Sequence, residues 1–164
     1  MQHESFLIGF AQLSLVMTGF VSVLFIFMAP EGGRSRVNTY HAVPIIMGSL
    51  ICLLASLIPL LLNAYGLEGR TVWWWSSVAG FALGTTYSIV ALSLTAQLTK
   101  AELKELGPIH IIAGFVMGAI AMLLLGWNIF VDVQIGHYLT ATVLTFFASL
   151  IAFVAFAIQK MLYW

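Results

Sequence analysis

The sequence predicts an all-α polytopic membrane protein, a bundle of five transmembrane helices in a single domain, residues 1–164. Of its residues, 62% are hydrophobic and only 7% are charged, against about 25% charged in an average soluble domain. Residues 72–97 form a stretch of 26 without Asp, Glu, Lys, Arg or His. A bilayer-spanning helix needs about 20 apolar residues. A chain this apolar would be unable to cover its surface in water, so its solvent is predicted to be lipid.

The remaining apolar stretches are separated by turn-forming or charged segments. The five predicted spans cover residues 5–28, 40–65, 72–97, 109–130 and 137–159. The second span contains Pro44 and Pro59. Proline lacks the backbone N–H that a helix needs, so Pro59 should kink this span and free a carbonyl. We expect Ser56 or a neighbouring helix to satisfy that carbonyl.

A short interfacial helix is predicted between the third and fourth spans, over residues 99–106. Thr99 and Glu102 have the spacing of a capping box, in which a Thr side chain caps the helix and a Glu reaches back to the Thr. Gly107 and Pro108 should end this helix, because both residues break helices.

The distribution of basic residues predicts the orientation of the bundle. One side holds Arg70 as its only Lys or Arg, and the other side holds five. Those five are Arg34, Arg36, Lys100, Lys104 and Lys160. The positive-inside rule therefore puts the N-terminus outside and the C-terminus in the cytoplasm. We expect the protein in the inner (cytoplasmic) membrane of a bacterium.

Each span carries a stripe of small or weakly polar residues at spacings of three and four, which places each stripe on one helix face. The stripes are Ser5, Gly9, Gln12, Val16 and Gly19; Ser49, Cys52, Ser56, Pro59 and Asn63; Ser77, Gly80, Gly84, Ser88, Ala91 and Thr95; His110, Gly114, Gly118 and Ala121; and Thr142, Thr145, Ser149, Ala152 and Gln159. Such stripes either pack helices closely or wet a pore, and we favour packing. The helix-packing candidates are Gly80, Gly84, Gly114 and Gly118.

Polar side chains also gather at one depth, the predicted outer half of the bundle. They are Gln12, Asn63, Ser76, Ser77, Asn128 and Thr142. These residues either line an outward-facing polar cavity or form hydrogen bonds between helices, and we favour hydrogen bonding. No acidic or basic residue lies well inside a span. This argues against proton relays and ion-coupled transport, which usually use ionisable groups within the membrane.

His41 and His110 start two separate spans on the same side. Two such imidazoles can ligate a b-type haem, but histidines at an interface are also common without a ligand. We expect no cofactor. Cys52 is the only cysteine, so no cysteine pair binds a metal. No catalytic motif is present, and we expect neither an enzyme nor a nucleic-acid partner.

These observations favour a small membrane protein that acts through lateral association in the lipid bilayer, as a homo-oligomeric pore or channel. The alternative is a non-catalytic accessory subunit that binds other membrane subunits of a larger complex. A haem- or pigment-binding protein comes third, and a membrane enzyme last.

Overall fold

The computed structural model describes residues 3–27, 36–106 and 108–162. The secondary-structure elements in these ranges are all helices: α1 (Glu4–Phe27), α2 (Arg36–Ala64), α3 (Arg70–Ala96), α4 (Lys100–Leu106), α5 (Pro108–Phe130) and α6 (Ile135–Leu162). Five of them, all except α4, are long and apolar enough to cross a membrane. The predicted all-helical fold with five spans is therefore confirmed, and each span begins and ends within four residues of the expected position.

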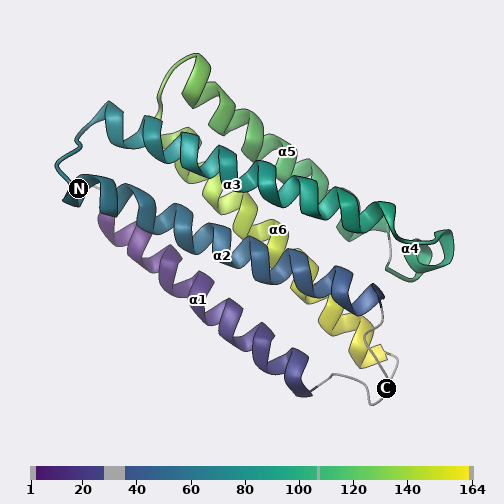
Figure 1. The fold of residues 1–164 in the computed structure, drawn as a ribbon. Coiled ribbons are helices and arrows are strands. Elements are labelled where there is room, and N and C mark those ends of the chain that lie inside the picture. The colour runs from purple at the N-terminus through teal and green to yellow at the C-terminus, as the bar shows by residue number, and fades with distance from the viewer. Residues whose placement is uncertain (1–2, 28–35, 107, 163–164) are drawn as a thin grey trace.

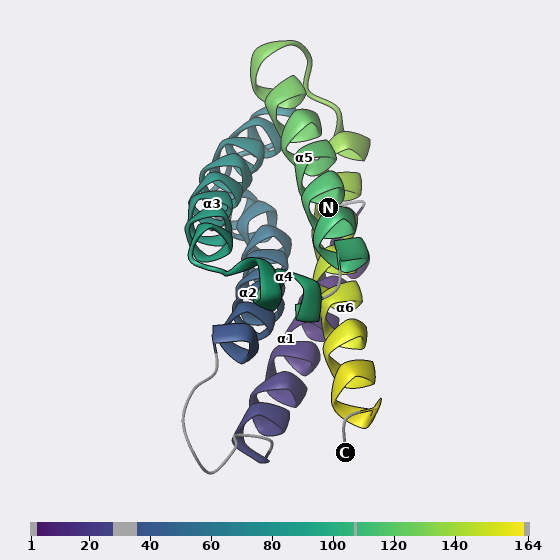
Figure 2. The ribbon, with the colours of Figure 1, turned by 90° about the vertical axis from the view of Figure 1, so that its right-hand side faces the viewer.

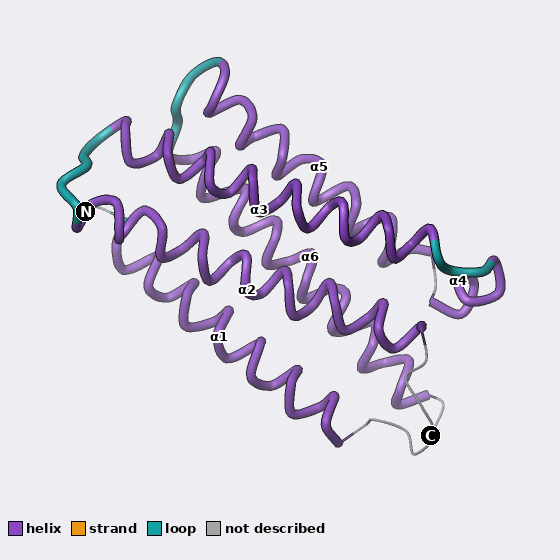
Figure 3. Tube along the Cα trace, in the orientation of Figure 1, coloured by secondary structure: helices purple, strands orange, loops and turns teal. Residues whose placement is uncertain are grey.

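The five long helices run up and down, and short loops connect α2 to α3 and α5 to α6 at one end (Figure 1, Figure 3). We call this end, which contains Arg70, the Arg70 end. The opposite end is the α4 end, where α4 joins α3 to α5. The first helix starts at the Arg70 end and α6 finishes at the α4 end (Figure 1). Which end faces the cytoplasm stays a prediction.

The central helix is α2, which packs against α1, α3 and α6, while α5 packs against α3 and α6. In Figure 2, α3 and α5 lie on opposite sides of the bundle, and α4 lies across their ends. Four helices, α2, α3, α5 and α6, therefore surround a common interior. The first helix lies outside this group.

The first helix buries one stripe against the rest of the bundle. The stripe consists of Leu7, Ala11, Ser14, Met17 and Val21. Its spacings of three and four keep it on one face, as helix packing requires. The opposite face of α1 is exposed, including Leu15 and Val16 at 60% and 69%.

Two aromatic contacts join α1 to α6. The rings of Phe10 and Phe146 meet edge to face at 5.5 Å, and those of Phe20 and Phe153 at 5.8 Å. Edge-to-face geometry is a favourable arrangement of aromatic rings. These contacts fix the peripheral helix at two levels along the bundle.

The predicted capping box is present at the start of α4. The Thr99 backbone N–H donates to Glu102 Oε2 at 2.8 Å, and the Glu102 N–H donates to Thr99 Oγ1 at 3.3 Å. Leu106, at the other end of α4, packs with Tyr40 of α2. Residues of α3 and α5, including Leu94 and Ile111, surround this pair. The short helix thus covers the α4 end of the interior.

The carbonyl freed by Pro59 is satisfied by a neighbouring helix. Proline at position 59 has no N–H for the carbonyl of Ala55, four residues earlier. The Tyr138 hydroxyl of α6 donates to this oxygen at 2.7 Å, and Tyr138 is only 1% exposed. The Ser56 hydroxyl donates instead to the Cys52 carbonyl at 2.8 Å. Of the two expected donors, the neighbouring helix is the one used.

Candidate functional site: a cavity within the bundle

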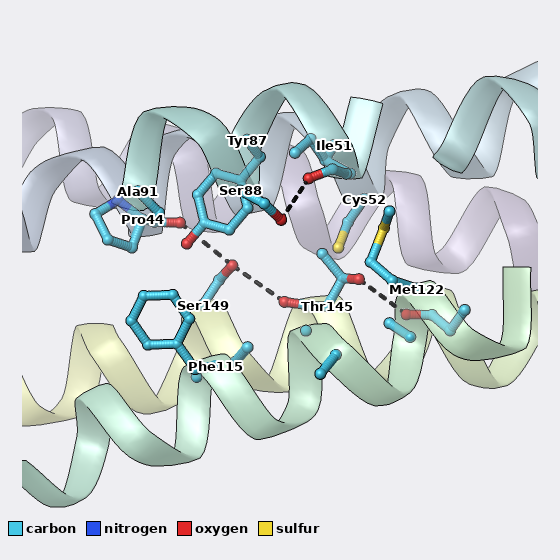
Figure 4. A pocket seen from close by; sticks show the side chains of 18 of the residues that line it. Pro44, Ile51, Cys52, Tyr87, Ser88, Ala91, Phe115, Met122, Thr145 and Ser149 are labelled. Carbon is cyan, nitrogen blue, oxygen red and sulfur yellow. Dashed lines mark hydrogen bonds between the residues drawn. The ribbon is translucent and has the colours of Figure 1, made fainter. Parts of the chain in front are cut away.

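A cavity of about 310 Å³ lies between α2, α3, α5 and α6 (Figure 4). Much of its wall consists of glycine and alanine, which leave space because their side chains are small. The small residues are Gly48, Ala55, Gly80, Gly84, Ala91, Gly114, Gly118, Ala119, Ala121, Ala141, Ala148 and Ala152. No charged side chain lines the cavity within the described part of the chain. Its volume falls at the lower end of the range of small-molecule sites, about 300–1,000 Å³.

Packed side chains close the cavity at the Arg70 end. Leu125 and Tyr138 line it and also belong to a buried cluster with Trp73 and Leu7. There α3 and α5 lie close together. A methyl group added at Gly80 would meet the Leu125 side chain at 3.4 Å.

Farther toward the α4 end the cavity extends to the surface between α3 and α5. Its lining there includes Leu92 of α3, 57% exposed, and Phe115 of α5, 39% exposed. In a membrane this surface would face lipid chains. The cavity therefore has a lateral opening between Leu92 and Phe115.

Hydroxyl groups provide most of the polarity of the wall. Ser88, Thr142, Thr145 and Ser149 each donate to a carbonyl four residues earlier in their own helix, at 2.8–3.1 Å. Such bonds satisfy the single hydroxyl proton internally. The wall consequently offers hydroxyl oxygens as acceptors.

Tyr87 contributes a different group. Its ring extends from α3 into the cavity (Figure 4). No described residue forms a hydrogen bond with its hydroxyl. A phenol carries one donated proton as well as lone pairs. Tyr87 therefore adds an uncommitted donor to a wall of acceptors.

Four of the five predicted stripes contribute residues to the interior, and that of α5 does so through Gly114, Gly118 and Ala121. Ser49, Cys52 and Ser56 of α2 are fully buried, as is Ser77 of α3, and Ser149 of α6 is 3% exposed. The α1 stripe behaves differently: Gln12, Val16 and Gly19 lie on its exposed face. The α1 helix packs through the other stripe described above.

The four glycines expected at close helix contacts fall into two groups. Gly80 and Gly84 lie against α5, and a methyl group at Gly84 would come within 2.5 Å of Met122 Sδ. A methyl group at Gly114 or Gly118 would meet nothing within 4 Å. Within this chain, Gly114 and Gly118 line the cavity and do not form a close helix crossing.

The closest glycine contact among the described residues occurs elsewhere, where α2 crosses α6. A methyl group at Gly48 would collide with the Ser149 hydroxyl. That hydroxyl also lies 3.5 Å from the Pro44 carbonyl. Gly48 has no G-x-x-x-G partner in the sequence, which is why the pattern did not single it out.

The predicted polar group at the Arg70 end is partly brought together around Asn128, which is 1% exposed. Its side-chain nitrogen donates to Ser77 Oγ at 3.1 Å and to the Gln134 carbonyl at 3.0 Å. Its side-chain oxygen accepts from the Gln134 N–H at 3.1 Å and lies 3.2 Å from His137 Nδ1. Asn128 thus connects α5, α3 and the turn into α6. This arrangement is hydrogen bonding between helices.

The other members of that group are dispersed. Thr142 lines the cavity, and Ser76 is fully buried. Gln12 and Asn63 are exposed on α1 and α2. The six residues do not share one polar cavity.

The two candidate haem ligands, His41 and His110, lie on α2 and α5. Their side chains fall outside the described part of the structure, so the geometry of this pair is not defined. Among the side chains that are described, no group of three or more His, Cys, Asp or Glu residues could hold a metal ion.

Sequence reasoning did not identify the cavity or Tyr87 as part of a site. Some of the small residues that form the wall, such as Gly84 and Gly118, belong to the predicted stripes, but a stripe pattern does not distinguish a contact from a space. No family model, curated protein or solved structure matches this chain.

Proposed function

We propose that this protein binds a neutral lipophilic molecule of the bilayer in the cavity between α2, α3, α5 and α6. The observation that carries this proposal is the uncharged, largely apolar cavity that extends between Leu92 and Phe115. Water gains little from a space with so few polar partners, and apolar cavities bind apolar molecules readily. A lateral opening lets such a molecule enter directly from the membrane.

Gly118 provides a test because a larger side chain there points into open space. Gly118→Leu should fill part of the cavity, since its first side-chain atom, Cβ, meets nothing within 4 Å. Gly19→Leu is the matched control: it also meets nothing within 4 Å but lies on α1, away from the cavity.

Native mass spectrometry of protein extracted gently from membranes gives the readout. Wild-type protein and Gly19→Leu should retain a bound lipophile, and Gly118→Leu should lose it. Equal retention in all three proteins, or no retained lipophile in wild type, would contradict the proposal.

Lateral association is the second candidate, favoured by the exposed Gln12. This amide lies on the surface of a predicted span. A polar group that faces lipid without a partner is costly. A second copy of the chain offers a suitable partner, because two glutamine amides can each donate to and accept from the other.

Gln12→Leu tests this association and the pore or accessory-subunit roles that depend on it. We expect the variant to shift cross-linked species from oligomer to monomer. Leu13→Ile, also on the exposed face, should leave association unchanged. If the oligomer persists in Gln12→Leu, this role of the amide is wrong. Current through a reconstituted oligomer in planar bilayers would favour the pore, whereas co-purified foreign subunits would favour the accessory role.

A further inference from the structure

The polar groups of the largely apolar cavity wall are several hydrogen-bond acceptors and one uncommitted donor. Ser88 Oγ donates to the Gly84 carbonyl at 2.8 Å, and Ser149 Oγ donates to the Thr145 carbonyl at 3.1 Å. With their protons committed, these hydroxyls present lone pairs to the cavity. Tyr87 alone among the hydroxyls of the wall that the structure describes has no hydrogen-bond partner.

Figure 4 shows how these groups are arranged. Tyr87 and Ser88 come from α3, whereas Thr145 and Ser149 come from α6 on the facing side. All four line the same space. Tyr40, also in the wall, is already 3.3 Å from Thr95 Oγ1. A polar group placed in the space therefore meets one free donor and several acceptors.

This pattern selects among neutral lipophiles. A hydrocarbon would leave the Tyr87 hydroxyl buried without a partner, which is unfavourable. An ether or ketone would satisfy Tyr87 but would meet only lone pairs elsewhere. An alcohol can accept from Tyr87 and donate to a serine or threonine oxygen. A charged head group would find no opposite charge in the wall and would lose its hydration.

We infer that the cavity binds a neutral lipid alcohol, with its hydroxyl at Tyr87 and its apolar body along the small-residue wall. This inference rests on the proposed lipophile-binding function and specifies the chemistry of the ligand. Tyr87 is the residue that determines specificity, and the glycines and alanines provide volume.

The test uses 1-hexadecanol, methyl hexadecyl ether and hexadecane as competitors against a diazirine-bearing hexadecanol photoprobe. The full-length protein is reconstituted in nanodiscs, and labelled peptides are mapped by mass spectrometry. In wild type, label should fall on α2, α3, α5 and α6, and hexadecanol should displace it at the lowest concentration.

Tyr87→Phe removes the donor and keeps the ring. One buried hydrogen bond corresponds to a roughly two- to tenfold change in affinity. The variant should bind hexadecanol more weakly by that factor, and its affinity for hexadecane should be unchanged. Unchanged hexadecane binding would also show that the variant is folded. Tyr65→Phe, at an 84% exposed position outside the cavity, should behave like wild type.

The outcomes separate the two proposals. If the three competitors displace the photoprobe at equal concentrations in wild type, the alcohol inference is overturned while cavity binding stands. The same holds if Tyr87→Phe lowers the affinity for hexadecanol and hexadecane alike. If the photoprobe labels no cavity peptide, or no competitor displaces it, the proposed function itself fails.

Discussion

The Tyr138 hydroxyl supplies the hydrogen bond that the backbone N–H of residue 59 would donate in a helix without proline. It donates to the Ala55 carbonyl at 2.7 Å, and Pro59 is the reason that this oxygen is available. A residue of α6 thereby completes the hydrogen bonding of α2. The proline-containing helix and its neighbour are interdependent.

Tyr138→Phe should destabilise the protein, because it leaves a buried carbonyl without a donor. Hydrogen bonds between membrane helices contribute about 0.6 kcal/mol on average and at most about 1.7, so we expect a loss of about 1 kcal/mol. Unfolding in mixed micelles with increasing SDS measures the change. In a Pro59→Ala background, the backbone N–H of the substituted alanine supplies the missing donor. Tyr138→Phe should therefore lower the unfolding free energy by less in this background. An equal loss in both backgrounds would contradict this dependence.

Gly48→Ala should destabilise the α2–α6 crossing. Its new methyl group would collide with the Ser149 hydroxyl, and overpacking typically costs about 1–3 kcal/mol. Gly114→Ala is the control, since its methyl group faces open space. The same SDS titration compares them, and Ser149→Ala should restore part of the loss in Gly48→Ala. Similar stabilities for the two glycine variants would show that this crossing is not tight.

Asn128→Ala should be among the more damaging polar substitutions. It removes two hydrogen bonds to the backbone of Gln134 and one to Ser77. At about 0.5–1.5 kcal/mol for each of the three bonds, we expect a loss of about 1.5–4.5 kcal/mol in unfolding free energy. Asn63→Ala, at an exposed position, should change stability by less than about 0.5 kcal/mol. A loss at Asn128 no larger than at Asn63 would refute its connecting role.

The orientation of the bundle is open to cysteine labelling in a Cys52→Ala background. Glu68 lies at the Arg70 end and Lys104 on α4, and both are exposed. From the charge bias, Glu68→Cys should react with an impermeant maleimide in intact cells, and Lys104→Cys should react only after lysis. The reverse pattern would show that the N-terminus is cytoplasmic.

The sequence predicted the helices well because their length and composition are local properties. The number of spans, the capping box of Thr99 and Glu102, and the need for a donor at the Ala55 carbonyl all follow from residues close together in the chain. The donor itself, Tyr138, was not predictable, because it depends on which helix lies beside α2 and how that helix is rotated.

The same limit explains the glycines. Gly84 and Gly118 each end a G-x-x-x-G pattern, yet one lies against Met122 and the other faces a cavity. The G-x-x-x-G pattern identifies small residues on one helix face, but it does not show whether another helix or an empty space lies against that face. The depth of a residue in the membrane also does not determine which way its side chain faces. Gln12 and Asn128 are predicted in the same half of the bundle, but Gln12 is exposed and Asn128 is buried.

The cavity between α2, α3, α5 and α6 also has a mechanical consequence. An internal space of about 310 Å³ makes the folded chain larger than its atoms alone require. Unfolding eliminates internal voids, so hydrostatic pressure favours the collapsed or unfolded forms. Because the space reaches the surface between Leu92 and Phe115, a molecule can enter it from the surrounding membrane. A bound molecule would remove this compressible volume and make the bundle stiffer without any change in charge.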